Sequence, residues 1–345
     1  MLDAMSLPLP RIPDPSEAPP LNWGVLAPGG IAATMVEALQ RYTRQRVVAV
    51  GSRSAGRADA FAQRFGIERA HGSYEALVAD PAVDAVYIAS PHSHHRDHAL
   101  LAIAAGKHVL VEKAFTRNAA EAGEVVDAAR SAGVACVEAM WTRFLPTTDI
   151  VRRLLADGAL GEVETVTADH GQWFAVDPTS RLFAPDLAGG ALLDLGIYPV
   201  SYASFVLGER ASVTARGSLT DLGVDRQVAA VLTHGSGAHA LVSTTLAART
   251  PTVAAISGSR ARIELDGPFY TPGVVRLVTC DGDVTESEPP AIQGHLGLCF
   301  EASHLAQLVA DGATESPLLP LEETVSIMET LDEIRAQVGV RYPGE

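Results

Sequence analysis

Short apolar runs alternate with segments of helical periodicity through the first 140 residues of the chain. The first run, from Trp23 to Leu26, contains no charge, which is typical of a strand that is buried on both faces. Apolar residues then recur at Ile31, Met35 and Leu39, so we expect a helix from about Ile31. Further strand-length runs occupy residues 47–50, 85–89, 108–111 and 134–138. Repeated strand–helix units of this kind predict a parallel, doubly wound sheet.

The pattern changes after about residue 142. Strand-like runs now follow one another with turn residues such as Gly235-Ser236-Gly237 between them, which favours a mainly antiparallel sheet. The runs occupy residues 163–170, 212–218, 228–233, 239–246, 253–257 and 262–265, and helical periodicity returns at 298–309 and 321–338. The predicted fold class is therefore α/β. We expect a Rossmann dinucleotide-binding domain at residues 21–142 and an α+β domain with a large, open, mainly antiparallel sheet at residues 143–345.

Residues 1–20 hold six prolines and show no periodicity. Such a segment favours extended, polyproline-like conformations and cannot form a core of its own. One interpretation is a disordered tail, the more common behaviour of chain termini. The other is an arm that lies on the dinucleotide-binding domain or on a neighbouring subunit.

Composition narrows the class of protein. The 345 residues carry a formal net charge of −15, which argues against nucleic acid or an anionic membrane as a partner. The apolar runs have the length of strands, so we expect no membrane span, and we expect no secretory signal. Three isolated cysteines, Cys136, Cys280 and Cys299, indicate a reducing, cytoplasmic location and neither a disulfide framework nor a zinc site.

The turn after the first strand has the character of a phosphate site. Ala27, Pro28, Gly29, Gly30 and Ile31 lie where backbone N–H groups and the helix dipole can receive a pyrophosphate. The stretch fits the G-x-G-x-x-G/A pattern in part, because Gly29 matches it whereas Ala27 replaces the first glycine. An ordinary strand–helix turn is the alternative interpretation.

The end of the second strand distinguishes the two nicotinamide dinucleotides. A carboxylate there binds the ribose 2′-OH of NAD, whereas small and basic residues admit the 2′-phosphate of NADP. The chain has Ser52, Arg53 and nearby Arg57, with no acid before Asp59. We therefore predict NADP as the cofactor, with NAD possible. A solvated loop arginine is the structural explanation for Arg53.

Other candidates follow later strands of the parallel sheet, at the carboxyl edge where open α/β sheets bind ligands. They are Ser90, Pro91 and His95 after one strand, Glu112 and Lys113 at the end of the next, and Trp141 and Arg143 after the last. We predict cofactor contacts from all of these except Trp141, which would line a substrate site together with Arg143. A structural role explains His95 equally well.

Two further candidates lie in the second half of the chain. Asp194 and Tyr198 are four residues apart in the apolar run from Gly189 to Pro199, so a carboxylate and a phenol would share one helical face. Either residue could instead be structural, Asp194 as a cap or buried acceptor and Tyr198 as part of the core.

The sequence contains no motif that is specific to another class of reaction. His94 and His98 lie one helical turn apart, but no further ligand cluster accompanies them, so we predict no metal. The chain has no G-x-S-x-G elbow, P-loop or H-E-x-x-H motif, so hydrolase and phosphotransferase interpretations have no specific support.

Together these stretches resemble the Gfo/Idh/MocA oxidoreductase family, within it most of all the branch containing dimeric dihydrodiol dehydrogenase and glucose–fructose oxidoreductase. The resemblance covers roughly residues 21–343. Its strongest parts are AGKHVLVEKAF at residues 105–115, EAMWTRFLP at 138–146, RLFAPDLAGGALLDLGIYP at 181–199 and LDEIRAQVGVRYP at 331–343. It implies a nicotinamide-binding domain followed by a substrate-binding domain whose open sheet forms a homodimer or homotetramer.

The resemblance also implies residue roles. Lys113 matches the lysine of the family's E-K-P motif, which lies beside the nicotinamide. Asp194 matches the aspartate of the D-x-G-x-H motif, and Tyr198 matches the tyrosine that replaces its histidine in this branch. Ala114 stands where E-K-P has proline, and Ala27 and His92 also differ from family residues.

The resulting prediction is an NADP-dependent oxidoreductase that transfers a hydride between nicotinamide and a secondary alcohol or carbonyl of a sugar, cyclic polyol or dihydrodiol. Tyr198 would be the acid/base, and Lys113 would favour its phenolate and stabilise the developing alkoxide. Asp194 would orient Lys113 or a substrate hydroxyl. The alternative is a non-catalytic NAD(P)-binding regulator or sensor on the same fold.

Overall fold

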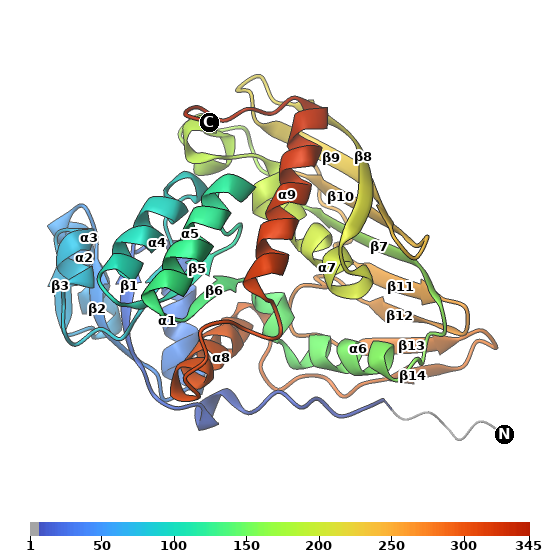
Figure 1. The fold of residues 1–345 in the computed structure, drawn as a ribbon, viewed down its shortest axis with the longest axis horizontal. Helices are drawn as coiled ribbons and strands as arrows, with labels where there is room; N and C mark the ends of the chain where they lie inside the picture. Colours follow the sequence, from blue (N-terminus) through green and yellow to red (C-terminus); the bar gives the residue numbers. More distant parts are fainter. Residues whose placement is uncertain (1–6) are drawn as a thin grey trace. The chain divides into compact units, whose positions relative to one another are not determined.

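The computed structural model describes residues 7–345, which fold as two compact units (Figure 1). The parallel-sheet unit comprises residues 13–144 and 295–328. The antiparallel-sheet unit comprises residues 7–12, 145–294 and 329–345. The first six residues of the predicted N-terminal arm lie outside the described part of the chain.

A six-stranded parallel sheet forms the centre of the parallel-sheet unit. Its strand order is β3-β2-β1-β4-β5-β6. The strands are β1 (Asn22–Leu26), β2 (Arg46–Gly51), β3 (Arg69–His71), β4 (Ala85–Ile88), β5 (His108–Glu112) and β6 (Cys136–Ala139). The predicted doubly wound sheet is confirmed. Its short edge strand β3 has no apolar run, so the hydrophobic pattern does not indicate it.

Helices α4 and α5 pack side by side in this unit, and α1 packs beside α8. The helices are α1 (Gly30–Tyr42), α2 (Ala55–Phe65), α3 (Tyr74–Val78), α4 (His95–Ala104), α5 (Ala119–Ala132) and α8 (Cys299–Ala310). The sequence predicts one domain boundary at residues 142–143, but the structure places 295–328 with the first unit. The physical reason is that α8 packs against β5 and β6, where its residues Ala302, Leu305 and Ala306 are fully buried.

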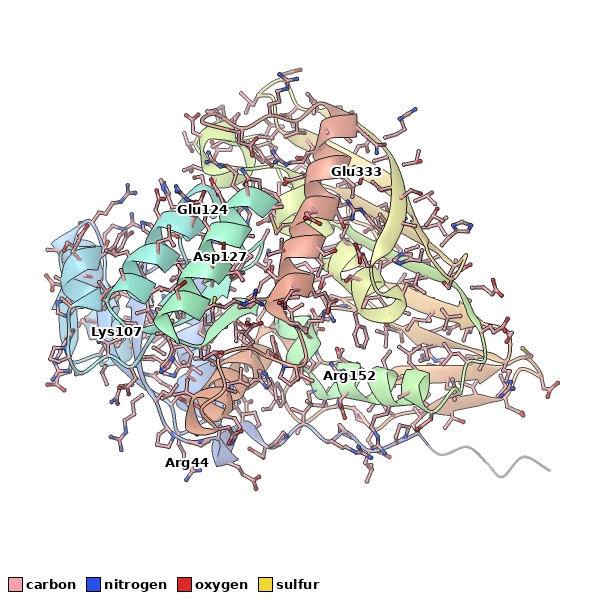
Figure 2. The ribbon with its side chains drawn as sticks, in the orientation of Figure 1. Arg44, Lys107, Glu124, Asp127, Arg152 and Glu333 are labelled. Carbon is pink, nitrogen blue, oxygen red and sulfur yellow. The ribbon has the colours of Figure 1, made fainter. Side chains whose placement is uncertain are left out.

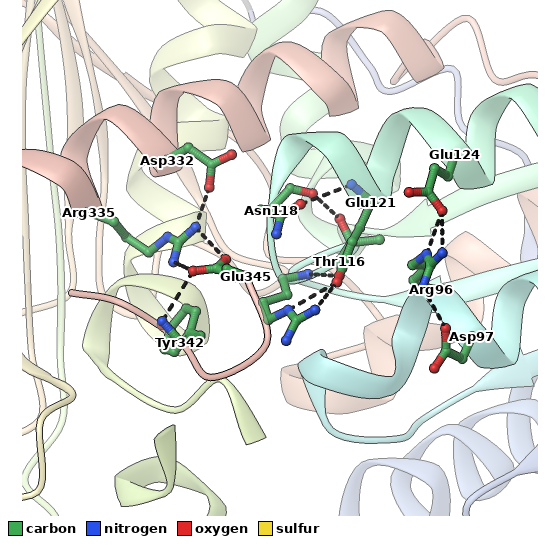
Figure 3. A network of polar contacts seen from close by, with 11 residues as sticks. Arg96, Asp97, Thr116, Asn118, Glu121, Glu124, Asp332, Arg335, Tyr342 and Glu345 are labelled. Atoms are coloured by element: carbon green, nitrogen blue, oxygen red, sulfur yellow. Dashed lines mark hydrogen bonds and ion pairs between the residues drawn. The ribbon is translucent and has the colours of Figure 1, made fainter. Parts of the chain in front are cut away.

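The start of α5 shows how local sequence begins a helix. Asn118 is the N-cap, and its side chain accepts a hydrogen bond from the Glu121 N–H at 2.9 Å. The Glu121 carboxylate binds the backbone and guanidinium of Arg117, one residue before the cap (Figure 3). On the exposed face of α5, Glu124 pairs with Arg96 of α4 at 2.6 Å (Figure 3). The pair Asn118 and Glu121 therefore marks the helix start in the sequence as well as in the structure.

An eight-stranded sheet forms the antiparallel-sheet unit, in the order β14-β13-β12-β11-β7-β10-β9-β8. The strands are β7 (Val163–Gly171), β8 (Arg210–Leu219), β9 (Asp225–His234), β10 (His239–Thr245), β11 (Ala254–Gly258), β12 (Ala261–Leu265), β13 (Val275–Thr279) and β14 (Val284–Glu286). Neighbouring strands are antiparallel except for β7 and β10. The mainly antiparallel sheet is thus confirmed, and the sequence pattern misses only its last two strands, which are short and interrupted by charge.

One face of this sheet is packed and the other is open. Helix α7 (Ile197–Leu207) packs on β7 and β10, and α6 (Pro146–Ala156) lies beside β13. The last turns of α9 (Leu321–Val338) reach β8, where the Gln337 side chain binds the backbone of Val213 and Ala215.

The C-terminus is tied to α9. The Arg335 guanidinium donates to Asp332 at 2.7 Å and to Glu345 at 2.9 and 3.0 Å (Figure 3). The Glu345 carboxylate also accepts from the Tyr342 N–H at 3.1 Å. These bonds give the last residues of the described chain fixed partners.

The expectation that all apolar runs have the length of strands is wrong for the most apolar helical segment. Residues 185–207 are long and apolar enough, by length and composition, to cross a membrane, whereas we expected only strand-length runs. The structure buries 78% of that window inside the unit, as for the core helix of a globular protein.

The N-terminal segment follows both units as an ordered arm. In the parallel-sheet unit, Ser303 of α8 donates to the Pro15 carbonyl at 3.2 Å, and Arg44 (labelled in Figure 2) donates to the Glu17 carbonyl at 2.8 Å. In the antiparallel-sheet unit, the Arg11 N–H donates to Asp149 of α6 at 2.7 Å. For residues 7–20 the structure therefore corresponds to the arm interpretation.

Candidate active site

The turn between β1 and α1 leaves room at the N-terminus of the helix. Ala27 has a φ of +69°, the left-handed conformation that a glycine would adopt more easily. Gly29 and Gly30 are exposed, and a Cβ on either would meet no atom closer than 4.0 Å. No side-chain hydrogen bond caps α1. The open space at the first turn of a helix, where N–H groups have no partner inside the helix, fits a pyrophosphate, which this turn would hold through its backbone.

The loop after β2 carries the predicted 2′-phosphate residues. Ser52 is buried, donates its N–H to the His71 carbonyl at 3.0 Å and accepts a bond from the Ser54 N–H at 3.3 Å. Arg53 and Arg57 are exposed beside it. Two solvated guanidinium groups next to a serine are suited to a phosphate dianion.

The loop after β4 is held by His98. Its Nδ1 lies 2.9 Å from the Ser90 hydroxyl, and its ring packs edge-on against Tyr74 with centroids 4.6 Å apart. Burial, together with the charges of neighbouring histidines and of Arg53, lowers the pKa of His98 to about 4. His98 is therefore neutral at physiological pH.

The segment Lys113–Phe115 follows β5, and side chains from three places hold its backbone. Its first N–H donates to Glu112 at 3.2 Å, and its last N–H donates to Glu138 of β6 at 3.2 Å. Its middle carbonyl, that of Ala114, lies 2.9 Å from the His95 Nδ1. The Lys113–Ala114 peptide bond is cis. Lys113 is thus presented by a segment whose backbone is bound by buried ionisable side chains.

His295 is a neighbour of Lys113 that the sequence pattern does not indicate. Burial and the Lys113 ammonium lower the pKa of His295, so this imidazole is neutral near the lysine. Its ring stacks on the Trp141 indole with centroids 5.5 Å apart. The only signal in the sequence is a histidine between two glycines, Gly294 and Gly297.

Three buried carboxyl groups lie near the Lys113 segment. Glu112 accepts a bond from the Tyr87 hydroxyl, and Glu138 accepts one from the Thr324 hydroxyl at 3.2 Å. Burial raises the pKa of Glu138 to about 7, although its hydrogen bonds oppose this. Glu301 of α8 is fully buried, and within residues 7–345 neither of its carboxyl oxygens has a hydrogen-bond partner. Burial and the charges of the other two carboxyls raise the pKa of Glu301 well above its usual value.

Arg143 has a partner inside the parallel-sheet unit. Its guanidinium is buried and pairs with Glu323. This ion pair anchors the short helix Trp141–Phe144 that follows β6. Contacts of Arg143 with cofactor or substrate stay predictions.

Asp194 and Tyr198 lie in the antiparallel-sheet unit. The turn Leu192–Gly196 is a π-helix, a form that often marks functional sites, and α7 begins directly after it. Buried Asp225 accepts the Leu192 N–H at 2.6 Å, and Arg181 donates to the Asp194 carboxylate at 2.8 Å. Asp194 is therefore an ion-paired carboxylate, and Asp225 is a supporting residue that the sequence pattern does not indicate.

Tyr198 packs within a group of three rings. Tyr270 stacks on it with centroids 4.5 Å apart, and His170 of β7 lies 5.3 Å from Tyr198 and 4.5 Å from Tyr270. The Gln172 amide lies 3.0 Å from the His170 Nε2. Burial and the Asp194 carboxylate raise the pKa of Tyr270. His170 and Tyr270 are distant in sequence from Tyr198, so no local pattern could associate them with it.

A metal centre finds no support among residues 7–345, where no group of three or more His, Cys, Asp or Glu side chains could hold an ion. The His94 and His98 rings stack with centroids 5.6 Å apart. The His98 Nδ1 is engaged with Ser90. The histidine-rich loop therefore contributes hydrogen bonds and ring packing.

A Rossmann sheet with an open glycine turn, followed by a lysine at its carboxyl edge, defines a nucleotide-binding oxidoreductase. The chain belongs to the Gfo/Idh/MocA oxidoreductase family. Residues 21–140 match its "Oxidoreductase family, NAD-binding Rossmann fold" model, and residues 149–264 match its "GFO/IDH/MocA C-terminal domain" model. This confirms the resemblance and the two-part α/β architecture.

Named relatives extend the comparison. Trans-1,2-dihydrobenzene-1,2-diol dehydrogenases of mouse and human are each 36% identical to this chain and cover 94% of it and 98% of their own length. Among solved structures, KijD10, a 3-ketoreductase from Actinomadura kijaniata in complex with NADP and TDP-benzene, is 28% identical, with a TM-score of 0.82, covering 93% of this chain and 98% of its own. An aldose-aldose oxidoreductase from Caulobacter crescentus is 25% identical, with a TM-score of 0.83 and the same coverage.

Proposed function

We propose that the protein is an NADP-dependent oxidoreductase that transfers a hydride between nicotinamide and a secondary alcohol or carbonyl of a sugar, cyclic polyol or dihydrodiol. The observation that carries this proposal is the Lys113 segment, bound by Glu112, Glu138 and His95 at the edge of a Rossmann sheet. The diol dehydrogenase relatives and the sugar-processing structural relatives support the substrate class.

The preference for NADP rests on the loop after β2. Arg53 and Arg57 are exposed there, and Ser52 stands where a carboxylate would bind a ribose 2′-OH. A 2′-phosphate would gain charge-assisted hydrogen bonds from these guanidinium groups. NAD would gain none of them, so it is the weaker ligand.

The roles of the side chains follow from the charge that develops during reduction. A bound nicotinamide would supply the hydride to the carbonyl carbon, which would leave negative charge on the substrate oxygen. Tyr198 donates a proton to that oxygen, and the Lys113 ammonium stabilises the charge. Asp194, held by Arg181 at 2.8 Å, accepts a hydrogen bond from a substrate hydroxyl and so orients it.

The test of this function is a substrate screen. Aldoses, cyclic polyols, dihydrodiols and dicarbonyls are offered with NADP(H) and with NAD(H), and nicotinamide absorbance is followed. We expect turnover with at least one of these classes and a higher kcat/KM with the phosphorylated cofactor. Cofactor release on denaturing the purified protein would show whether it is held tightly and cycled between two substrates.

The regulator hypothesis predicts binding without turnover. A protein that binds NADP(H) but oxidises or reduces none of these compounds would favour it over the enzyme. The dehydrogenase names of the curated relatives support the enzyme.

We also propose self-association through the open face of the eight-stranded sheet. Val231 and Leu241 lie directly opposite each other on β9 and β10, and 41% and 46% of their surfaces are exposed. Thr214 and Thr167 flank them in the same row. An uncharged row of this kind is suited to the same surface of a second copy.

We also propose a cytoplasmic location, which the scattered free cysteines support.

A further inference from the structure

His95, the first residue of α4, has carbonyl oxygens at both of its ring nitrogens. The Nε2 lies 2.6 Å from the Ser90 oxygen, and the Nδ1 lies 2.9 Å from the Ala114 oxygen. The ring is fully buried. Carbonyl oxygens only accept hydrogen bonds, and a neutral imidazole has only one N–H. A neutral His95 would therefore point a nitrogen lone pair at one of the two oxygens.

Rotating the ring does not remove this conflict. It would bring ring carbons to the two positions, where C–H···O contacts need about 3.3–3.6 Å. The observed separations of 2.6 and 2.9 Å are those of N–H···O bonds, the shorter one typical of a charged donor. Two such bonds require the imidazolium form.

The two carbonyls belong to different functional loops. Ser90 follows β4, and Ala114 follows β5 next to Lys113, while β4 and β5 are neighbouring parallel strands. His95 thus ties the predicted cofactor loop to the segment that presents the lysine. A neutral ring could hold only one of these loops by a good hydrogen bond.

The charges around His95 permit a buried cation. The Lys113–Phe115 segment that it binds also contacts the carboxyls of Glu112 and Glu138, which accept the two N–H groups on either side of the Ala114 carbonyl. The Lys113 ammonium, on the same segment, has the same sign of charge as an imidazolium and so disfavours it.

The remaining titratable neighbours come from the histidine loop, α4 and α5. The His92 ring lies edge-on to His95 with centroids 5.6 Å apart. His98 lies on the same helix as His95, and the charge of His95 contributes to lowering the pKa of His98. Arg96, the next residue of α4, is paired with Asp97 and with Glu124 of α5. The carboxyls of Glu112 and Glu138 are thus the groups suited to balance the imidazolium.

We propose that His95 is a positioning residue that works as an imidazolium, donating to Ser90 and Ala114 and so fixing Lys113 against the cofactor loop. The consequence for turnover rests on the proposed function, since it assumes that Lys113 acts on the substrate. The protonation state of His95 does not depend on the proposed function and can be measured without any substrate.

The decisive experiment is NMR of the full-length protein with ¹⁵N-labelled histidine at pH 8. An unperturbed imidazole, with a pKa of about 6.5, is neutral under these conditions. We expect His95 to show two protonated nitrogens, whereas His98, whose pKa burial lowers to about 4, shows the neutral pattern. The His95 signal is assigned by its loss in His95→Gln or, should that variant not fold, by triple-resonance assignment of the unaltered protein. A neutral tautomer at His95 overturns the proposal.

Kinetics then test the positioning role. His95→Gln keeps a polar side chain but carries both of its N–H groups on one nitrogen and has no charge, so it cannot reproduce the two ring donors at their positions. We expect kcat to fall roughly ten- to a hundredfold, a larger change than that in the KM for NADPH. His239→Gln is the matched control. An imidazolium signature with unchanged kcat in His95→Gln overturns the positioning role. Absence of any turnover in the unaltered protein would count against the proposed function and leave the NMR result to decide the charge state.

Discussion

Tyr198 and Lys113 make different contributions to the proposed reaction, and each can be altered alone. Tyr198→Phe removes only the proton donor, and Lys113→Met removes only the charge. General acid–base catalysis is typically worth ~10²–10⁴-fold, so each variant should lose kcat in about that range. NADPH binding, followed by fluorescence titration, should persist in Tyr198→Phe.

Tyr202 supplies the matched control for Tyr198. It lies one turn further along α7, it is buried, and within residues 7–345 its hydroxyl has no hydrogen-bond partner. Tyr202→Phe therefore removes a hydroxyl without removing a bond and should keep normal turnover. Near-normal turnover of Tyr198→Phe with an unshifted pH profile would contradict the assigned role.

Arg53 tests the choice of cofactor. Losing one charge-assisted bond to a phosphate costs about 1.5–3 kcal/mol, or about ten- to a hundredfold in affinity. Arg53→Ala should weaken NADP(H) by that factor and leave NAD(H) nearly unchanged, as measured by calorimetric titration. Arg64→Ala, an exposed arginine at the other end of α2, is the control. Equal affinity of the unaltered protein for both cofactors would rule out the preference.

At the scale of elements, α8 brings a fully buried carboxyl group, that of Glu301, into the parallel-sheet unit. Burial and two neighbouring carboxyls raise the pKa of Glu301, so above about pH 4.5 the native state binds more protons than the unfolded state. The contribution of Glu301 to the free energy of unfolding therefore falls as pH rises above about 4.5. Each unit by which a pKa is raised corresponds to about 1.4 kcal/mol.

Glu301→Gln should remove this pH dependence. Between pH 5 and pH 8, the unaltered protein should lose more unfolding free energy than the variant, measured by urea denaturation. The shifts of Glu138 and Asp225, to about 7 and about 6, act in the same direction but are common to both proteins and cancel. Asp127→Asn, on the exposed face of α5 (Figure 2), should follow the unaltered protein. Parallel curves for all three proteins would show that Glu301 is ionised in the native state.

At the scale of the whole molecule, the open face of the eight-stranded sheet is the surface to alter. Replacing Val231 and Leu241 together by lysine places two charges in the centre of the exposed row. Light scattering at micromolar concentration should give a dimer or tetramer mass for the unaltered protein and a monomer mass for this variant. Val176→Lys, at an exposed loop valine, is the control and should keep the larger mass. A monomer mass for the unaltered protein would refute self-association.

The division of the chain is also a property of the whole molecule. The sequence predicts one crossing between domains, because composition changes once, near residue 142. The structure has α8 return to the parallel-sheet unit, where it supplies Glu301, while His295 just before it stacks on Trp141. No local pattern could show this, since the apolar stripe of α8 is compatible with packing on any sheet.

By itself the sequence determined the elements and the kind of chemistry. Uninterrupted apolar runs indicate buried parallel strands, and Asn118 marks the start of α5, because both signals act between residues near in the chain. The position of Lys113 after β5 follows in the same way from strand order. Short polar β3, and β13 and β14 with their charges, lack the periodicity and escape this reasoning.

Only the tertiary structure decided which side chains support the candidate site. His295 beside Lys113, and Tyr270 and His170 against Tyr198, join residues far apart in sequence. The Ala114 carbonyl at the His95 Nδ1 also comes from another strand end. The sequence predicts that His95 lies on the helix that follows a strand of the parallel sheet, yet its charge depends on the two acceptors that folding brings to it. Protonation and hydrogen bonding are set by distances of a few ångströms in space, and those distances exist only once the chain has folded.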